Sequence, residues 1–210
     1  MSRGLGDVYK RQLPAFSCHA YGRDYHKVIR KRLKGICREM EEEFGCATRI
    51  CVDSAPVMER YWASRAGIGI IGDNHCLIVE GKGSMVFLAE ILTTLNVEPD
   101  EPTDRGCLHC GACFRTCPTG ALSTEGIDAR RCLSYLTIEH RGEFPVRTDT
   151  KNTLYGCDRC QTACPYNRDA APTEIEEFAP TEKVLTLTAE ECAGMDDCLL
   201  YTSPSPRDTR

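Results

Sequence analysis

Residues 107–118 read CLHCGACFRTCP and residues 157–165 read CDRCQTACP. The first stretch has the C-x2-C-x2-C-x3-C-P spacing with which proteins ligate four-iron clusters. The second stretch adds three cysteines, and Cys132 stands between the two stretches. Two [4Fe–4S] clusters need four thiolates each, and these groups together supply that number. The sequence therefore predicts a domain that holds two iron–sulfur clusters.

The pairing of thiols with clusters follows from the same spacing. In two-cluster proteins the last cysteine of each run ligates the other cluster. One predicted ligand set is Cys107, Cys110, Cys113 and Cys164, and the other is Cys117, Cys132, Cys157 and Cys160. Zinc is the main alternative, because C-x2-C pairs also form tetrahedral sulfur sites, and disulfides are another. Zinc sites do not require three such cysteines followed by Cys-Pro, so clusters are favoured. The PTGAL segment after Cys117 is expected to turn into a helix.

The composition limits the cellular location and the binding partners that the protein can have. The chain has 210 residues, 15 cysteines and a formal net charge of -5. Free thiols for iron imply a reducing, cytoplasmic location rather than a disulfide scaffold, and no apolar run reaches the length of a membrane span. The net charge gives no global case for nucleic-acid binding. Residues 1–12 and 198–210 resemble translated sequencing-adapter remnants, so we expect a natural fragment from 13 to 197, truncated at both ends.

The first half of the chain alternates expected helices and strands. Apolar spacing predicts a helix over 24–44 with Gly45 as its stop, and TRICV at 48–52 predicts a strand. The basic start of the helix is interpreted as a solvated face rather than an RNA contact. Asp53 follows the strand and precedes a helix expected at 57–66. From the residues alone, Asp53 is more simply a cap or turn residue than a ligand of a bound molecule.

Glycines and short strands are expected between this region and the cysteines. Residues 67–74 form a glycine-rich loop, and strands at 76–79 and 85–91 are expected to pair as a hairpin. The loop follows a helix rather than a strand, which argues against dinucleotide binding. Prolines near residue 100 indicate a linker. Beyond it we expect a helix over 128–140 that carries Cys132, a loop over 141–154, and a further helix from 189 to 195.

A composite of motifs across the chain resembles one family. The segments are GRDYH (22–26), VDSAP (52–56), RAGIG (65–69), IGDN (71–74), FLAEI (87–91), the first cysteine run, LSYLTIEH (133–140) and GCDRCQ (156–161). Together they resemble the epoxyqueuosine reductases, in order and over essentially all of 13–197. The resemblance implies an oxidoreductase that uses cobalamin and two [4Fe–4S] clusters. Its reaction would reduce the epoxide of epoxyqueuosine in tRNA to the alkene of queuosine, the last step of queuosine biosynthesis.

The family resemblance also implies a domain organisation within an α+β fold. A cobalamin-binding α/β domain of nitroreductase-like type, related to reductive dehalogenases, would be present in part over 13–100. A ferredoxin-like domain with both clusters would cover 101–170, and 171–197 would begin a C-terminal region. The implied partners are a tRNA with epoxyqueuosine at the wobble position and an unidentified low-potential electron donor, with no membrane. We expect a monomer.

The resemblance further implies roles for particular residues. Asp53 would donate a proton to the leaving oxygen, which requires a pKa raised by burial against the apolar corrin. Cobalamin contacts are expected at Asp53, Ile71, Gly72, Asn74, Ser134 and Asp158. Cys18 lies near the region where the family approaches the corrin, although a lone cysteine is more often a packing residue. Phosphate contacts of the tRNA are expected at Arg141, Arg147, Lys151 and Arg168.

Some positions depart from the family, and two rival functions share part of the pattern. Asp73 and His75 stand where the family has Lys and Thr, Cys192 replaces an aromatic residue, and the family's N-terminal segment, which contributes to the cobalamin pocket, is missing. A reductive dehalogenase-like enzyme would share cobalamin and both clusters. A two-cluster electron carrier would not need the patterned helix and strands before Cys107.

Overall fold

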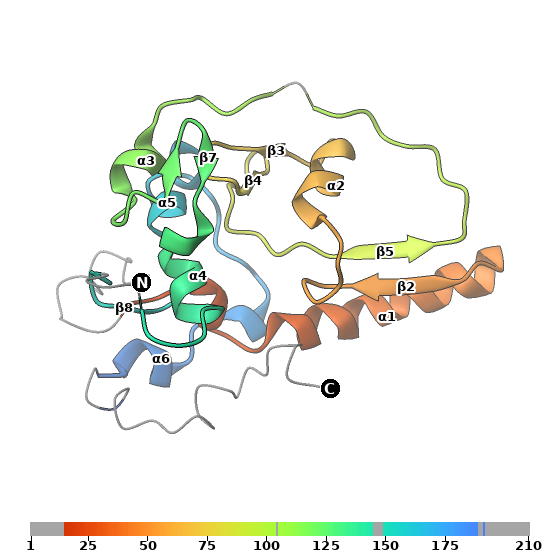
Figure 1. Ribbon diagram of the computed structural model, residues 1–210. Helices are drawn as coiled ribbons and strands as arrows, with labels where there is room; N and C mark the ends of the chain where they lie inside the picture. Colours follow the sequence, from red (N-terminus) through yellow and green to blue (C-terminus); the bar gives the residue numbers. More distant parts are fainter. Residues whose placement is uncertain (1–14, 104, 145–148, 189–190, 192–210) are drawn as a thin grey trace.

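The computed structural model describes residues 15–103, 105–144, 149–188 and 191. It has mixed helix and strand content (Figure 1), as expected for the coarse fold class. The elements before the cysteine runs are β1 (Ala15–Phe16), the 3-10 helix η2 (Cys18–Ala20), α1 (Tyr25–Phe44), β2 (Thr48–Cys51), α2 (Glu59–Arg65), β3 (Ile70–Ile71), β4 (Leu77–Ile78) and β5 (Glu90–Thr93). The later elements are α3 (Ala112–Thr116), β6 (Leu122–Ser123), β7 (Gly126–Ile127), η3 (Ala129–Arg131), α4 (Leu133–Ile138), β8 (Thr153–Tyr155), α5 (Arg159–Thr162), η4 (Pro165–Asn167), η5 (Glu176–Phe178) and α6 (Glu182–Thr186).

Helix α1 confirms the prediction made from apolar spacing. Asp24 caps its start, because the carboxylate accepts a hydrogen bond from His26 N at 2.9 Å. Gly45 ends the helix in the left-handed conformation, with φ of 63°, and its N–H donates to the Glu41 carbonyl. Val28 and Cys37 are buried on the inner face. Both ends of the longest helix are thus set by residues that the sequence alone identifies.

The strand pairing differs from the predicted hairpin. Strand β4 pairs antiparallel with β3, whereas β5 pairs antiparallel with β2, from Thr48 opposite Thr93 to Cys51 opposite Glu90. The predicted pairing of 76–79 with 85–91 is therefore wrong. Gly69 explains the difference, because a Cβ there would lie 2.3 Å from the Ile78 carbonyl oxygen. Its missing side chain lets the preceding segment, rather than the following one, approach β4.

Four further local predictions need correction. Helix α2 begins at Glu59, two residues after the predicted start. The predicted helix over 128–140 is broken at Cys132, whose extended backbone (φ -69°, ψ 123°) separates η3 from α4. The segment after Cys117 leads to strand β6 rather than a helix, and β8 lies at the end of the predicted 141–154 loop, pairing in parallel with β1. The helix expected from 189 lies almost wholly outside the described residues.

The two halves of the chain lie side by side and are joined by hydrogen bonds. In Figure 1, α1, β2 and β5 occupy one side and α3, α4 and α5 the other, with the irregular connection after β5 running across the molecule between them. Ser84 N donates to Asn167 Oδ1 at 2.6 Å, and Asn167 Nδ2 donates to Ser84 Oγ at 2.9 Å. Val52 and Leu133 are among the most deeply buried side chains, one in each half. None of the described helices is long and apolar enough to cross a membrane.

Candidate functional site

One small cavity collects four of the predicted cluster ligands. Its lining includes the first predicted ligand set, Cys107, Cys110, Cys113 and Cys164. Three of these thiols come from the first run and α3, and Cys164 follows α5 more than forty residues later. Burial, and then the thiolates of Cys107 and Cys110, raise the pKa of Cys164. Four thiols at one cavity can share a bound metal group, so this donor set fits an iron–sulfur cluster.

The remaining predicted ligands gather beside the first set. Burial, together with the nearby thiols of Cys160 and Cys132, raises the pKa of Cys157 to about 11. Cys117 is among the charges that raise the pKa of Cys160. Cys117 Sγ also accepts a hydrogen bond from Ala121 N at 3.2 Å. The structure therefore brings the second predicted ligand set together from three separated segments, with Cys132 supplied by the break before α4.

The turn between β3 and β4 lies against both thiol groups. Asp73 and Asn74 line the first cavity, and the side chain of Cys76 is hydrogen-bonded to Cys160 of the second group. This hydrogen bond raises the pKa of Cys160 and lowers that of Cys76. Cys76 was not among the predicted ligands, because it stands outside both cysteine runs. Its placement comes from the β3–β4 pairing, which the sequence did not indicate.

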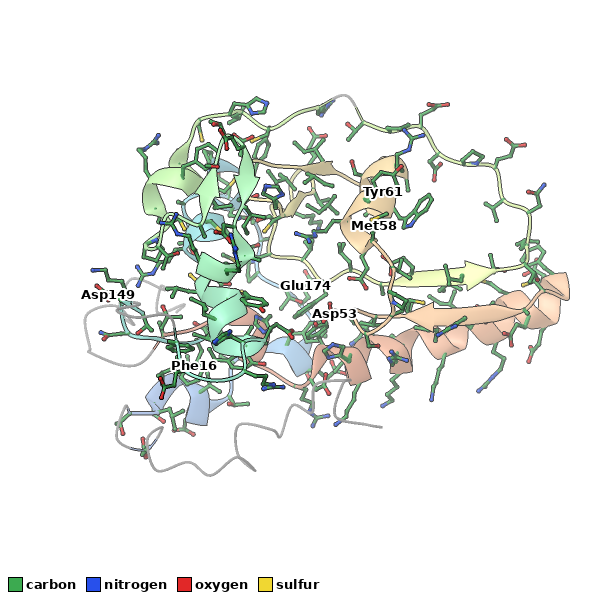
Figure 2. All side chains as sticks on the ribbon, in the orientation of Figure 1. Phe16, Asp53, Met58, Tyr61, Asp149 and Glu174 are labelled. Atoms are coloured by element: carbon green, nitrogen blue, oxygen red, sulfur yellow. The ribbon has the colours of Figure 1, made fainter. Side chains whose placement is uncertain are left out.

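A second group of polar side chains surrounds Asp53, just beyond the end of β2. Tyr25 Oη donates to Asp53 Oδ2 at 2.8 Å, and His26 Nε2 lies 3.4 Å from the same oxygen. The other ring nitrogen of His26 lies 2.8 Å from Asp24 Oδ1. Figure 2 shows Asp53 at the start of the connection to α2, close to the first turn of α1. Two carboxylates thus flank one imidazole, and one of them accepts a phenolic hydroxyl, which is an arrangement suited to holding and moving a proton.

The backbone and the charges of this group set it apart from an ordinary turn. Asp53 has φ of 54°, a left-handed conformation that is strained for a residue other than glycine. Its N–H donates to Glu59 Oε1 at 2.6 Å, which helps to fix that conformation. Burial alone lowers the pKa of His26, but the hydrogen bonds to Asp53 and Asp24 outweigh it and raise the pKa. Burial and the charge of Asp53 raise the pKa of Tyr25, so this phenol remains a donor.

The other expected cobalamin contacts fall in different surroundings. Ile71 is 43 % exposed, whereas the neighbouring Gly72 is buried. Gly72 packs closely on Ile78, since a Cβ at position 72 would lie 2.6 Å from Ile78 Cδ1. Asn74 is buried at the first thiol cavity. Ser134 is half-buried in the first turn of α4. These positions therefore form no single group.

Asp158, expected as a corrin contact, also links the two halves of the chain. Its carboxylate accepts hydrogen bonds from the hydroxyl of Ser17 and, at 2.6 Å, from Cys18 N. Burial, followed by the charge of Asp158, raises the pKa of Cys18 to about 12, so this thiol stays protonated. Gly156 makes the approach possible, because a Cβ there would lie 2.4 Å from Ser17 Cβ. Both oxygens of Asp158 are thus engaged with the segment after β1.

Of the residues expected to contact tRNA phosphates, three are described. Arg141 and Arg168 are exposed. Lys151 is also exposed, and its Nζ lies 2.6 Å from Asp149 Oδ2. Arg147 lies outside the described residues. Tyr25 and His26 contact Asp53 but were not predicted as site residues. In the sequence analysis they appear only within the GRDYH motif. Their adjacency to a predicted helix start was the available signal.

Comparison of the sequence with protein families gives two matches. Residues 5–54 match the family described as "Epoxyqueuosine reductase QueG, DUF1730", and residues 106–167 match the "4Fe-4S double cluster binding domain". The chain is 42 % identical over 173 residues to the epoxyqueuosine reductase of Leadbetterella byssophila, covering 81 % of this chain and 57 % of that protein. It is 43 % identical over 170 residues to the Escherichia coli enzyme, covering 78 % of this chain and 44 % of the relative.

Solved structures agree with the sequence matches. An epoxyqueuosine reductase crystallised with an epoxyqueuosine-modified stem loop of tyrosine tRNA superposes with a TM-score of 0.82 at 32 % identity. That match covers 90 % of this chain and 51 % of the other. The enzyme from Streptococcus thermophilus gives a TM-score of 0.69 at 36 % identity, covering 76 % of this chain and 45 % of that one. The chain thus spans about half the length of the relatives it matches.

Proposed function

Because the chain belongs to the epoxyqueuosine reductase family over the part that it spans, we propose that it contributes to the reduction of epoxyqueuosine in tRNA to queuosine. The observation that carries the proposal is the pairing of two sites. Two groups of thiols suited to [4Fe–4S] clusters lie in one half, and a carboxylate beside a phenol and an imidazole lies in the other. Removal of an epoxide oxygen needs both electrons and an acid, and the two sites supply one requirement each.

The thiol groups would hold the electron relay. The cavity formed by Cys107, Cys110, Cys113 and Cys164 offers four sulfur donors to one cluster. Cys117, Cys132, Cys157 and Cys160 would hold the other. Cys160 of the second group is among the charges that raise the pKa of Cys113 and of Cys164, so the two groups are neighbours, and electrons would pass between the clusters that they hold. The match to a double-cluster family over 106–167 supports this reading over zinc or disulfides.

We also propose that the first half contributes to a cobalamin site. Cobalamin, when bound, would supply reduced cobalt as the nucleophile or reductant at carbon. The exposed side chain of Ile71 offers apolar surface of the kind a corrin face requires. The Asp53 side chain is 59 % exposed, so a corrin and a substrate would be needed to bury it and raise its pKa. Asp53 would then donate the proton to the leaving oxygen, with Tyr25 and His26 orienting the carboxyl.

The domain organisation follows from the same proposal. Residues 13–100 would form part of a nitroreductase-like α/β domain, and 101–170 a ferredoxin-like domain. The antiparallel β6–β7 pair between the two cysteine groups, and the short helices α3 and α5 that follow the first cysteines of each group, support the second assignment. Gly72, Asn74, Ser134 and Asp158 remain predicted cobalamin contacts from the family resemblance. For Asp158, the hydrogen bonds to Ser17 and Cys18 favour a structural role.

The tRNA would bind through local basic side chains on an acidic protein. A solved relative described with a modified tRNA stem loop supports tRNA as the substrate class. Arg141, Lys151 and Arg168 are exposed on the cluster half and available to phosphates, and Arg147 is proposed with them from the sequence. Binding through a few such contacts should weaken steeply as salt rises.

The proposal is tested by reconstitution followed by turnover. The full chain is loaded anaerobically with iron and sulfide, passed through gel filtration with cob(II)alamin, and examined by electron paramagnetic resonance. We expect two clusters and a cobalt signal altered from that of free cofactor. An epoxyqueuosine-containing stem loop should then yield queuosine when a low-potential reductant is supplied. Clusters and cobalamin without any turnover of the stem loop would contradict the substrate assignment.

A further inference from the structure

A buried amide group is part of the wall of the first thiol cavity, and one end of it is unpaired among the described residues. Asn74 is 5 % exposed and lines the cavity with Cys107, Cys110, Cys113 and Cys164. Its Nδ2 atom is buried and has no hydrogen-bond partner among the described residues. Leaving a buried donor unpaired costs about 1–3 kcal/mol, so such groups in native proteins usually meet a ligand.

The orientation of this amide is fixed by its own turn. Asn74 Oδ1 accepts a hydrogen bond from Cys76 N at 3.1 Å. Reversing the amide would set its NH2 group against the N–H of Cys76, two donors facing each other, so the hydrogen bond identifies which end is nitrogen. Since the oxygen end is held by the turn, the NH2 group is the end that remains able to bind a ligand.

The turn itself has little freedom to move. Gly72 N donates to the Cys76 carbonyl at 3.0 Å, and His75 N donates to the Gly72 carbonyl at 2.8 Å. The flanking strands pair Ile70 with Ile78, and Ile78 is 3 % exposed and also lines the cavity. The amide of Asn74 is therefore presented by a rigid element, as a donor to a bound group must be if its effect is to be constant.

We propose that Asn74 Nδ2 donates a hydrogen bond to a sulfur of the [4Fe–4S] cluster held by Cys107, Cys110, Cys113 and Cys164, and thereby raises the reduction potential of that cluster. The inference rests on the cluster assignment of the proposed function but not on its cobalamin or tRNA parts. Hydrogen bonds to cluster sulfurs favour the reduced, more negative state, because they offset the added charge. Asn74 is thus a positioning residue that acts on the electron relay.

The first test uses a variant of nearly identical shape. Asn74→Asp keeps an oxygen for Cys76 N but removes the NH2 donor. Both clusters should still form, as judged by iron content. In a redox titration followed by electron paramagnetic resonance, the oxidised-to-reduced ratio of one cluster at a fixed potential should rise about tenfold. For a one-electron couple this means that the reduction potential of the cluster falls by about 59 mV. An unchanged potential with both clusters present would overturn the proposal.

A matched double variant separates the lost donor from the added charge. Asp73 lines the same cavity, so Asp73→Ala combined with Asn74→Asp keeps the net charge of the cavity wall and leaves no amide donor at either position. We expect the double variant to retain most of the fall in potential. Recovery of the wild-type potential would mean that charge alone is responsible, and the hydrogen bond would be rejected.

A measurement on the unaltered chain removes the dependence on variants. With 15N-labelled asparagine, pulsed magnetic resonance of the reduced cluster should detect a coupled amide nitrogen and an exchangeable proton. Absence of both couplings overturns the proposal even where a variant fails to bind its cluster. Loss of cobalamin from Asn74→Asp with unchanged potential would instead assign Asn74 to the corrin. Failure of the wild-type chain to reduce epoxyqueuosine leaves these readouts intact, so it bears on the proposed function alone.

Discussion

The two halves of the molecule are built in different ways. Before residue 104, a helix of 20 residues is bounded by an aspartate cap and a left-handed glycine, and a four-residue strand pair runs along it. In the cluster half, from 105 to 168, the longest helix described has six residues and the strands have two or three. Such short elements bury too little surface to be stable alone. The first half is therefore stabilised by its own secondary structure, whereas the second half depends on its thiols.

Removing one cluster ligand should break the cluster half alone. For Cys117→Ala we expect the iron content to fall from about eight to about four per chain, because one [4Fe–4S] site loses a thiolate. The cluster that contains Cys157 is the one expected to be lost. Iron analysis and electron paramagnetic resonance check this. Cys37→Ala is the matched control, since Cys37 is buried in α1 outside both groups and should leave the iron content unchanged. Loss of the cluster that contains Cys107 would show that the ligand sets are wrongly assigned.

Neutralising the acid in the first half should leave the cluster half untouched. Asp53→Asn should retain both clusters and lower turnover of the modified stem loop about 10²-fold or more, the usual worth of a proton donor. Tyr25→Phe keeps the stacking on Phe87, whose ring lies 4.3 Å away, and loses only the hydroxyl, so a smaller fall is expected. Single-turnover assays at equal cluster content measure both. Unchanged turnover in Asp53→Asn would remove Asp53 from the chemistry.

Cutting the tie between the halves should have a moderate effect on stability. Asp158→Asn replaces an acceptor of the bonds from Ser17 and Cys18 with an NH2 group. Hydrogen bonds to charged groups contribute about 1.5–3 kcal/mol, which in a chain of this size lowers the melting temperature by about 5 °C. Asp149→Asn is the control, because its pair with Lys151 is exposed and should change little. Equal melting temperatures for the two variants would show that Asp158 does not join the halves.

The smallest expected effect is a pH dependence of the melting temperature that arises from His26 in the first half. The pKa of His26 is raised in the folded chain, despite burial, by hydrogen bonds to Asp53 and Asp24. The contribution of protonated His26 to the stability of the folded chain is therefore fully present below about pH 6.5, and it is lost as the pH rises above that value. The melting temperature of the wild-type chain should exceed that of His26→Gln at the lower pH, and the difference should shrink on raising the pH. His19, whose pKa burial lowers, is common to both proteins. A difference that grows with pH would contradict the assignment.

The sequence identified the parts of this molecule that depend on local chemistry. The spacing of Cys107 to Cys117 favours iron–sulfur ligation, and Asp24 and Gly45 mark the ends of α1 because caps act over one turn. The pairing of β3 with β4 was missed, because it depends on the close approach at Gly69, which no pattern in the sequence reveals. For the same reason the position of Asn74 at a thiol cavity was not predicted. Tyr25 and His26 reach Asp53 through the packing of α1 on β2, which is likewise a long-range outcome.

The fourth thiol of the first cavity has a consequence for how the chain assembles. Joining Cys113 to Cys164 through one metal group closes a loop of about fifty residues. In the cross-link model, the lost conformational entropy raises the free energy of the unfolded chain by about 4 kcal/mol. All four thiols of the second group lie inside that loop. The first cluster to be inserted would thus bring the ligands of the second closer together. Partly loaded chains should then be scarce, and titration with limiting iron should give a mixture of empty and fully loaded protein.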